Sequence, residues 1–179
     1  MIYLDMDGVI ADFFGGIEKQ FDVRHWKDLK WKEEVFAKLA YTDFFDTLPC
    51  FFDGDTNLST KIVDLVKLQA FENNVQWGIC SSPMRGDETN SIYHKRVWLE
   101  RMNFMPEVCN CIFTSNKHKY AMSPIDSRPN ILIDDKPENI YRWEQAGGLG
   151  IRFQANEDDF EEYLKEQIED CFITRNVRC

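Results

Sequence analysis

The sequence opens with a short apolar run that ends in two carboxylates two residues apart, Asp5 and Asp7, followed directly by Gly8. If the run is a strand and the chain turns at Gly8, both carboxylates can converge on one point. Converging carboxylates repel one another unless a cation lies between them. Mg²⁺, which takes oxygen ligands and commonly works beside a phosphate, meets that need. The alternative is an ordinary turn, because Asp and Gly are both turn residues.

Polar residues follow three other apolar runs along the chain. If each run is a strand of one parallel sheet, these residues meet at its carboxyl edge, where ligands bind in such sheets. Carboxylates for a cation, hydroxyls for a phosphate oxygen and an ammonium group for its charge together favour phosphoryl transfer without a Gly-rich loop. The three segments are Ser81-Ser82-Pro83, Ser115-Asn116-Lys117 and Asp134-Asp135-Lys136-Pro137.

The elements that must position these groups alternate between strand and helix patterns. This alternation predicts an α/β fold, with a Rossmann-like three-layer core in which helices cover both faces of a parallel sheet. An acidic stretch at 157–169 is interpreted as the exposed face of a C-terminal helix. The candidate strands are 2–4, 75–80, 111–114, 131–133 and 150–153, and the candidate helices begin near Leu58, Ile92 and Pro137.

Residues 15–55 break this alternation, because they hold no convincing strand and are rich in aromatic side chains. We predict a core of residues 1–14 and 56–179, with 15–55 inserted after the first strand as a small helical cap. A segment that leaves the core directly after Asp5 and Asp7 should lie over the carboxyl ends of the strands and act as a lid. Its aromatic residues also fit a simpler interpretation, since a small subdomain needs large side chains to build a core.

The amino-acid composition limits the kinds of molecule that the protein is expected to bind. The net charge of −10 and the lack of a Lys/Arg run argue against long nucleic acid, whereas a small anion can still bind where local cations and a metal outweigh the global field. No apolar run is long enough for a membrane span. Six cysteines without regular spacing favour a reducing, cytoplasmic compartment. Zinc at Cys109 and Cys111 is the weaker interpretation of that pair. The oligomeric state stays open, a homodimer included.

Four motifs in order resemble those of the haloacid dehalogenase superfamily, and the resemblance covers nearly the whole chain. Within it, the strings at 4–13, 79–83 and 132–139 are similar to the 5′(3′)-deoxyribonucleotidase family and its bacterial and phage relatives. The resemblance implies a Mg²⁺-dependent hydrolase whose substrate is a small nucleotide. The motifs are Asp5-Met6-Asp7-Gly8-Val9, Ser81-Ser82-Pro83, Lys117 and Ile133-Asp134-Asp135.

The resemblance also implies roles for the matching residues. Asp5 would be the nucleophile that forms an aspartyl phosphate, and Asp7 the general acid and base. Mg²⁺ would be held by Asp5, the backbone carbonyl of Asp7 and Asp134, with Asp135 as a water-mediated partner. The residues expected to bind phosphate are Ser81, Ser82, Lys95 and Lys117.

Some positions depart from the family pattern or leave a choice. Ser81 stands where Thr is more common, and it keeps the hydroxyl. Lys119 takes the role of Lys117 if the loop register differs, and Lys95 fits equally well as an exposed helical lysine. Lys136 stands where relatives often carry Arg, and a lysine does not make the bidentate contact of an arginine.

The family places aromatic side chains around the nucleoside, and Phe13, Phe44 and Phe45 match those places, although each also fits as cap core. The expected activity is hydrolysis of (deoxy)nucleoside monophosphates to nucleoside and phosphate. One alternative is a phosphatase for another small phosphate ester or a polynucleotide 3′-phosphate end. Another is a catalytically silent binding module, against which the four intact motifs argue.

Overall fold

The computed structural model describes residues 1–29 and 32–177, and its centre is a five-stranded parallel sheet in the order β5-β4-β1-β6-β7. Leu4 of the central strand pairs with Ile79 on one side and Ile133 on the other. The predicted α/β fold is confirmed, and every strand lies within two residues of its predicted bounds. The strands are β1 (Ile2–Leu4), β4 (Trp77–Ser81), β5 (Cys111–Phe113), β6 (Ile131–Asp134) and β7 (Leu149–Arg152).

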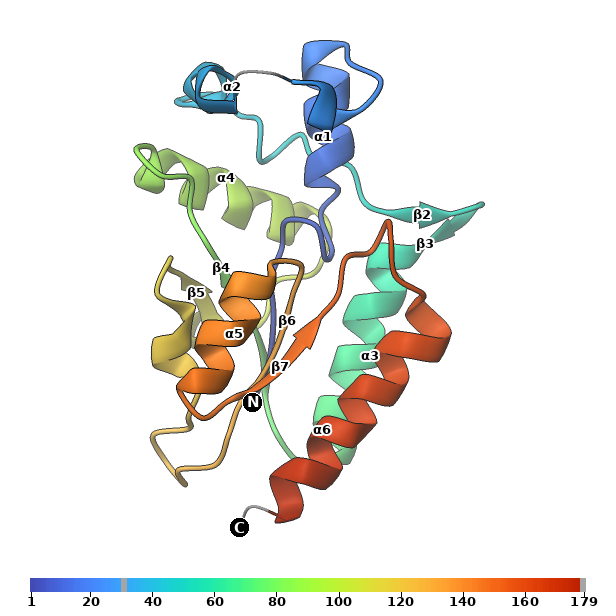
Figure 1. Ribbon diagram of the computed structural model, residues 1–179, viewed down its shortest axis with the longest axis vertical. Coiled ribbons are helices and arrows are strands. Elements are labelled where there is room, and N and C mark those ends of the chain that lie inside the picture. The colour runs from blue at the N-terminus through green and yellow to red at the C-terminus, as the bar shows by residue number, and fades with distance from the viewer. Residues whose placement is uncertain (30–31, 178–179) are drawn as a thin grey trace.

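Helices cover both faces of the sheet (Figure 1). Leu4 points into a large core that includes Ile62, whereas its neighbour Tyr3 packs on the other face against Trp143, with ring centroids 5.9 Å apart. Burial on both faces explains why the strands read as continuous apolar runs. The core helices are α3 (Leu58–Glu72), α4 (Glu88–Arg101), α5 (Pro137–Gln145) and α6 (Lys165–Val177), with a π-helical turn at Phe160–Leu164 and 3₁₀ turns at Val108–Asn110 and Lys117–Tyr120.

The helix boundaries follow local chemistry. The side chain of Asn57 caps α3 by accepting a hydrogen bond from the backbone N–H of Thr60 at 2.9 Å. Pro137 occupies the first turn of α5, where its missing N–H costs nothing. The acidic C-terminal helix continues past its predicted stretch to Val177, because Phe172 also packs into the core.

Residues 15–55 are termed the inserted segment, and the helices of its described part lie above the carboxyl ends of the strands (Figure 1). The segment contains most of α1 (Phe13–Phe21), a 3₁₀ turn at Trp26–Asp28 and α2 (Lys32–Leu39). The expectation that it holds no strand is wrong at one end, where β2 (Phe52–Asp53) forms a short hairpin with β3 (Thr56–Asn57). The division into core and cap stays a prediction.

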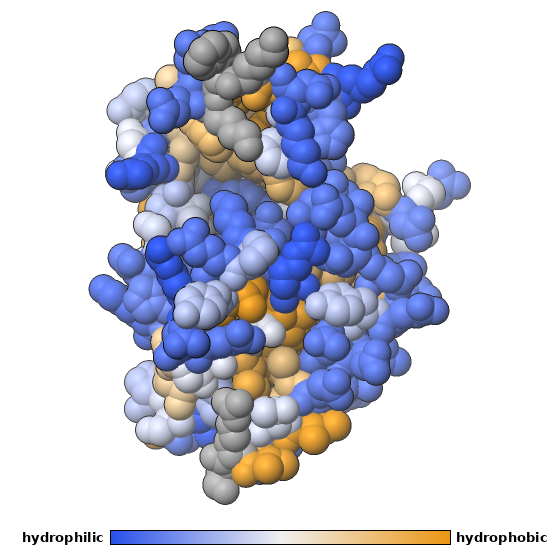
Figure 2. Space-filling model, viewed as in Figure 1, coloured by the Kyte–Doolittle hydropathy of each residue, from blue (hydrophilic) through white to orange (hydrophobic). Residues whose placement is uncertain are grey.

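Hydrophilic side chains cover most of the face shown in Figure 2, and the surface is indented between the inserted segment and the core. This agrees with a net charge of −10. Within the described ranges, no helix combines the length and the apolar character needed to cross a membrane.

Candidate active site

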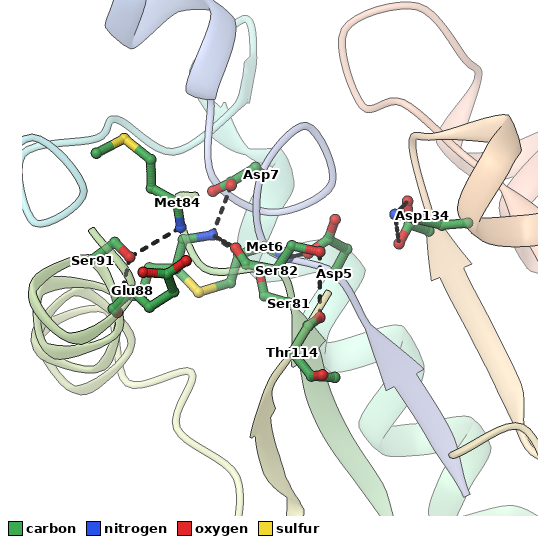
Figure 3. A network of polar contacts seen from close by, with 12 residues as sticks. Asp5, Met6, Asp7, Ser81, Ser82, Met84, Glu88, Ser91, Thr114 and Asp134 are labelled. Atoms are coloured by element: carbon green, nitrogen blue, oxygen red, sulfur yellow. Dashed lines mark hydrogen bonds and ion pairs between the residues drawn. The ribbon is translucent and has the colours of Figure 1, made fainter. Parts of the chain in front are cut away.

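Three neighbouring strands deliver polar side chains to one edge of the sheet. β1 ends directly before Asp5, while β4 and β6 end at Ser81 and Asp134. The backbone N–H of Asp5 donates to the carbonyl oxygen of Ile133 at 2.9 Å, which continues the pairing of β1 with β6. Figure 3 shows Asp5 and Asp7 on the turn after β1, with Ser81 close to Asp5 and Asp134 on the opposite side. The parallel register therefore brings together the motifs found in the sequence.

A buried lysine joins two of the carboxylates. The Nζ atom of Lys117 lies 2.9 Å from Oδ2 of Asp5 and 2.5 Å from Oδ2 of Asp134. Lys119 is exposed, so Lys117 is the lysine that the loop register brings to the carboxylates. Burial acts to lower the pKa of Lys117, but the two carboxylates outweigh burial, so its pKa is raised.

The same contacts set the charge of Asp5. Burial acts to raise the pKa of Asp5, but the ammonium groups of Lys117, Lys95 and Lys136 outweigh burial and hold this pKa below its ordinary value. Burial and the nearby charge of Asp5 instead raise the pKa of Asp134. Asp5 is therefore ionised at neutral pH, which is the form that a carboxylate nucleophile requires.

Three carboxylates are placed to hold a cation. In the part of the chain that the structure describes, oxygen atoms of Asp5, Asp134 and Asp135 lie within 4.8 Å of one another. The Oδ1 atom of Asp135 is buried with no hydrogen-bond partner among the described residues, and burial together with the charge of Asp5 raises the pKa of Asp135 to about 8. A buried, unpartnered carboxylate is costly unless a cation compensates it. The oxygen-only donor set fits Mg²⁺. The carboxylate of Asp7 is not part of this group, and Asp7 was expected to contribute its backbone carbonyl.

Asp7 instead contacts a second buried lysine, Lys95, in the middle of α4. The Nζ atom of Lys95 donates to Oδ2 of Asp7 at 2.7 Å, to Oγ of Ser81 at 3.0 Å and to the carbonyl oxygen of Ser82 at 2.9 Å. The same Nζ lies 4.8 Å from the ring centroid of Phe45. The alternative of an exposed helical lysine is wrong, because Lys95 is 0% exposed.

Asn139, a residue without a predicted role, lies against Asp134. Its Nδ2 atom donates to Oδ1 and Oδ2 of Asp134 at 3.0 and 3.1 Å, and the backbone N–H of Lys136 donates to Oδ1 at 2.9 Å. These bonds fix the orientation of the Asp134 carboxylate. The signal was present in the sequence, because an amide in the first turn of the helix that follows an acid pair faces back toward it.

The three phenylalanines expected around a nucleoside form one aromatic cluster. Phe44 and Phe45 are only 4% and 3% exposed. The ring of Phe13 lies 5.8 Å from that of Phe44 and 6.2 Å from that of Phe45. Phe13 is half-buried and borders an apolar cavity of about 40 Å³ in the inserted segment, too small for a nucleoside. The burial of Phe44 and Phe45 favours their interpretation as core, and Phe13 retains an exposed part.

Helix α4 also holds the second half of the inserted segment, residues 41–48. Side chains of the helix and of its N-cap residue Asp87 bind four backbone groups of this stretch, three of them at 2.7–2.9 Å. The contacts run along the helix and are Asp87 with the N–H of Tyr41, Asn90 with the carbonyl of Thr42, Trp98 with the carbonyl of Leu48, and Arg101 with Asp46.

Two other features lie away from this edge. An open groove of about 590 Å³ is bordered by α3, the π-helical turn and α6, and none of the predicted site residues lines it. Cys109 is exposed and Cys111 is buried, and neither belongs to the group of described side chains close enough to hold a metal.

Comparison with known proteins shows similarity to a curated protein and to a solved structure. No family model matches the chain. The chain is 28% identical over 153 residues to the mitochondrial 5′(3′)-deoxyribonucleotidase of Mus musculus, and the match covers 76% of this chain but 64% of the relative. A solved structure of a hydrolase from Pseudomonas syringae superimposes with a TM-score of 0.49 and 14% identity, covering 95% of this chain and 89% of that one. The chain is thus similar in sequence to a deoxyribonucleotidase and spans about two thirds of its length.

Proposed function

We propose that the protein is a Mg²⁺-dependent phosphomonoesterase that hydrolyses (deoxy)nucleoside monophosphates through an aspartyl-phosphate intermediate. The observation that carries the proposal is the state of Asp5, which is buried at the end of the central strand and held ionised by Lys117. The similarity to a deoxyribonucleotidase supports the choice of substrate class.

In the proposed first step, a carboxylate oxygen of Asp5 attacks the phosphorus atom and the bond from phosphorus to the ester oxygen breaks. The leaving oxygen takes a proton from Asp7. In the second step, water attacks the same phosphorus atom, Asp7 accepts the proton of that water, and the acyl phosphate bond breaks. Inorganic phosphate leaves and the carboxylate of Asp5 is restored.

The remaining groups of the site would balance the negative charge of the phosphate and hold it in position. Asp5, Asp134 and the backbone carbonyl of Asp7 would hold Mg²⁺, with Asp135 as its water-mediated partner. When bound, Mg²⁺ offsets the negative charge of the phosphate oxygens. The hydroxyls of Ser81 and Ser82 would donate to those oxygens, and Lys117 supplies the positive charge closest to Asp5.

A phosphate-release panel tests this proposal. It compares deoxyribonucleotides, ribonucleotides, sugar phosphates and a 3′-phosphorylated oligonucleotide, each with Mg²⁺ and with EDTA. We expect release only with Mg²⁺, and a kcat/KM for deoxynucleotides about tenfold or more above that for sugar phosphates, the worth of one stacked base. Equal efficiency on all small esters would leave a general phosphatase. Release from the oligonucleotide alone would indicate an end-processing enzyme, and no release at all would leave a binding module.

A further inference from the structure

We propose that Lys95 is a positioning residue, which holds Asp7 and Ser81 in their reactive orientations and does not itself bind the phosphate. This inference rests on the proposed function, and it replaces the phosphate-binding role expected for Lys95 from the sequence. It follows from the bonding of one ammonium group.

The ammonium group of Lys95 has no donor left for a substrate. A lysine carries three N–H donors, and Nζ has three acceptors, which lie on Asp7, Ser81 and Ser82 at 2.7–3.0 Å. The ring of Phe45 lies 4.8 Å from Nζ, and Lys95 is 0% exposed. A phosphate oxygen would have to displace one of these buried partners to reach Nζ.

Lys117 differs in this respect. Among the residues that the structure describes, its acceptors are the carboxylates of Asp5 and Asp134. One of its three donors therefore remains for a phosphate oxygen. The two buried lysines thus have different roles. Lys117 can donate to the negatively charged phosphate, whereas all three N–H donors of Lys95 are bound to protein acceptors.

The bonds of Lys95 also decide which atoms of its partners face the substrate. It binds Oδ2 of Asp7, and the other oxygen, Oδ1, is buried and has no hydrogen-bond partner in the part of the chain that the structure describes. That free oxygen is the one that can carry the proton for the leaving group. At Ser81, the hydroxyl oxygen accepts from Lys95, so the Ser81 O–H is free to donate. Lys95 therefore orients both the proton-carrying oxygen of Asp7 and the donating hydroxyl of Ser81 toward the same substrate.

The inference predicts a specific kinetic pattern for Lys95→Met, which keeps the length of the side chain and removes its charge. Loss of orientation at Asp7 should lower kcat by ~10²-fold or more for a deoxynucleotide, and by less for p-nitrophenyl phosphate, whose leaving group needs no proton. KM and the Mg²⁺-dependent affinity for inorganic phosphate, measured by calorimetry, should change by less than about tenfold, because Ser81 loses its orientation but no direct phosphate contact is lost.

A double variant separates positioning from binding. If Lys95 acts through Asp7, Asp7→Asn with Lys95→Met should be hardly slower than Asp7→Asn alone, since residues that act as a unit are not additive. Arg96→Met is the matched control on the same helix, because Arg96 packs over Phe113 outside the site and its loss should leave kcat unchanged. Circular dichroism and thermal unfolding check the fold, and Lys95→Gln replaces Lys95→Met if the latter does not fold.

The outcomes are distinguishable. A weakening of phosphate binding by tenfold or more, with equal losses on both leaving groups and additive effects in the double variant, would show direct phosphate binding and overturn this inference alone. A wild-type protein that releases phosphate from no substrate would overturn the proposed function and this inference with it.

Discussion

A Cβ atom added to Gly8 would lie 2.8 Å from Oδ2 of Asp135, so the turn that follows Asp7 closes directly against a buried carboxylate. Gly8 also has a φ of 78°, which disfavours any residue with a side chain. Gly8 is therefore required at this position, because Asp135 occupies the space that any other side chain would need.

Gly8→Ala should destabilise the protein by ~1–3 kcal/mol from backbone strain, with a further loss from displacement of Asp135. Gly54→Ala is the matched control, because Gly54 has a φ of 55° and nothing within 4 Å of its added Cβ. Urea unfolding of both variants isolates the contact with Asp135. Equal losses in the two variants would mean that the contact between the added Cβ and Asp135 does not affect the free energy of unfolding.

Asp5→Asn should lower kcat by ~10⁴-fold or more, because an amide cannot attack phosphorus as a carboxylate does. Circular dichroism should stay unchanged. Asp22→Asn is the control, since Asp22 is exposed and its φ of 51° suits Asn. Single-turnover phosphate release measures the effect, and an Asp5→Asn enzyme that kept more than a few per cent of the activity would exclude Asp5 as the nucleophile.

Asn139→Ala removes both hydrogen bonds from Nδ2 to the carboxylate of Asp134. We expect Mg²⁺ affinity to fall by about 10–100-fold, as is usual when a residue that orients a metal ligand is lost. Isothermal titration with Mg²⁺ measures this. Glu138→Ala, at the adjacent exposed position, should bind Mg²⁺ like the wild type. Unchanged affinity in Asn139→Ala would place the metal elsewhere.

The pKa of Asp135 predicts how stability depends on pH without metal. This pKa is about 8 in the folded protein against 3.8 ordinarily, so the folded state retains a proton that the unfolded chain has released. In EDTA, stability should therefore fall as the pH rises through this window. Urea unfolding at pH 5 and pH 8 measures the fall, which should be smaller in Asp135→Asn. Added Mg²⁺ should stabilise the wild type more at pH 8 than at pH 5, and the opposite order would contradict the assignment.

The aromatic cluster predicts two different responses to truncation. Phe44→Ala should cost ~3–5 kcal/mol of stability, as for a buried aromatic side chain. The half-buried Phe13 is better placed to contact a ligand, so Phe13→Ala should cost ~1–3 kcal/mol of the preference for deoxynucleotides over p-nitrophenyl phosphate. Phe71→Ala is the control for stability, since Phe71 is 84% exposed on α3. Loss of the nucleotide preference in Phe44→Ala but not in Phe13→Ala would reverse this assignment.

The strands of the core and the site residues at their ends could be predicted from the sequence, because local patterns of apolar and polar residues specify them. Apolar runs of three to five residues must be strands when helices cover both faces, and polar residues at their ends must meet at one edge. These patterns predict the meeting of Asp5, Ser81, Lys117 and Asp134 at that edge.

The partners of these residues were harder to predict because they come from distant parts of the chain. Lys95 is 88 positions from Asp7, and only the packing of α4 against the sheet brings the two together. The burial of Phe44 and Phe45 depends on how the inserted segment meets α4, and no periodicity in that segment specifies such a contact.

The contacts between α4 and residues 41–48 have a consequence for ligand exchange. Swinging this stretch away from the core would break hydrogen bonds along the whole length of α4, each worth ~0.5–1.5 kcal/mol, and would remove the ring of Phe45 from Lys95. Residues 41–48 are therefore the part of the inserted segment that is fastened to α4, beside Lys95. A motion that keeps these bonds intact can still involve α1 and α2, which take no part in them.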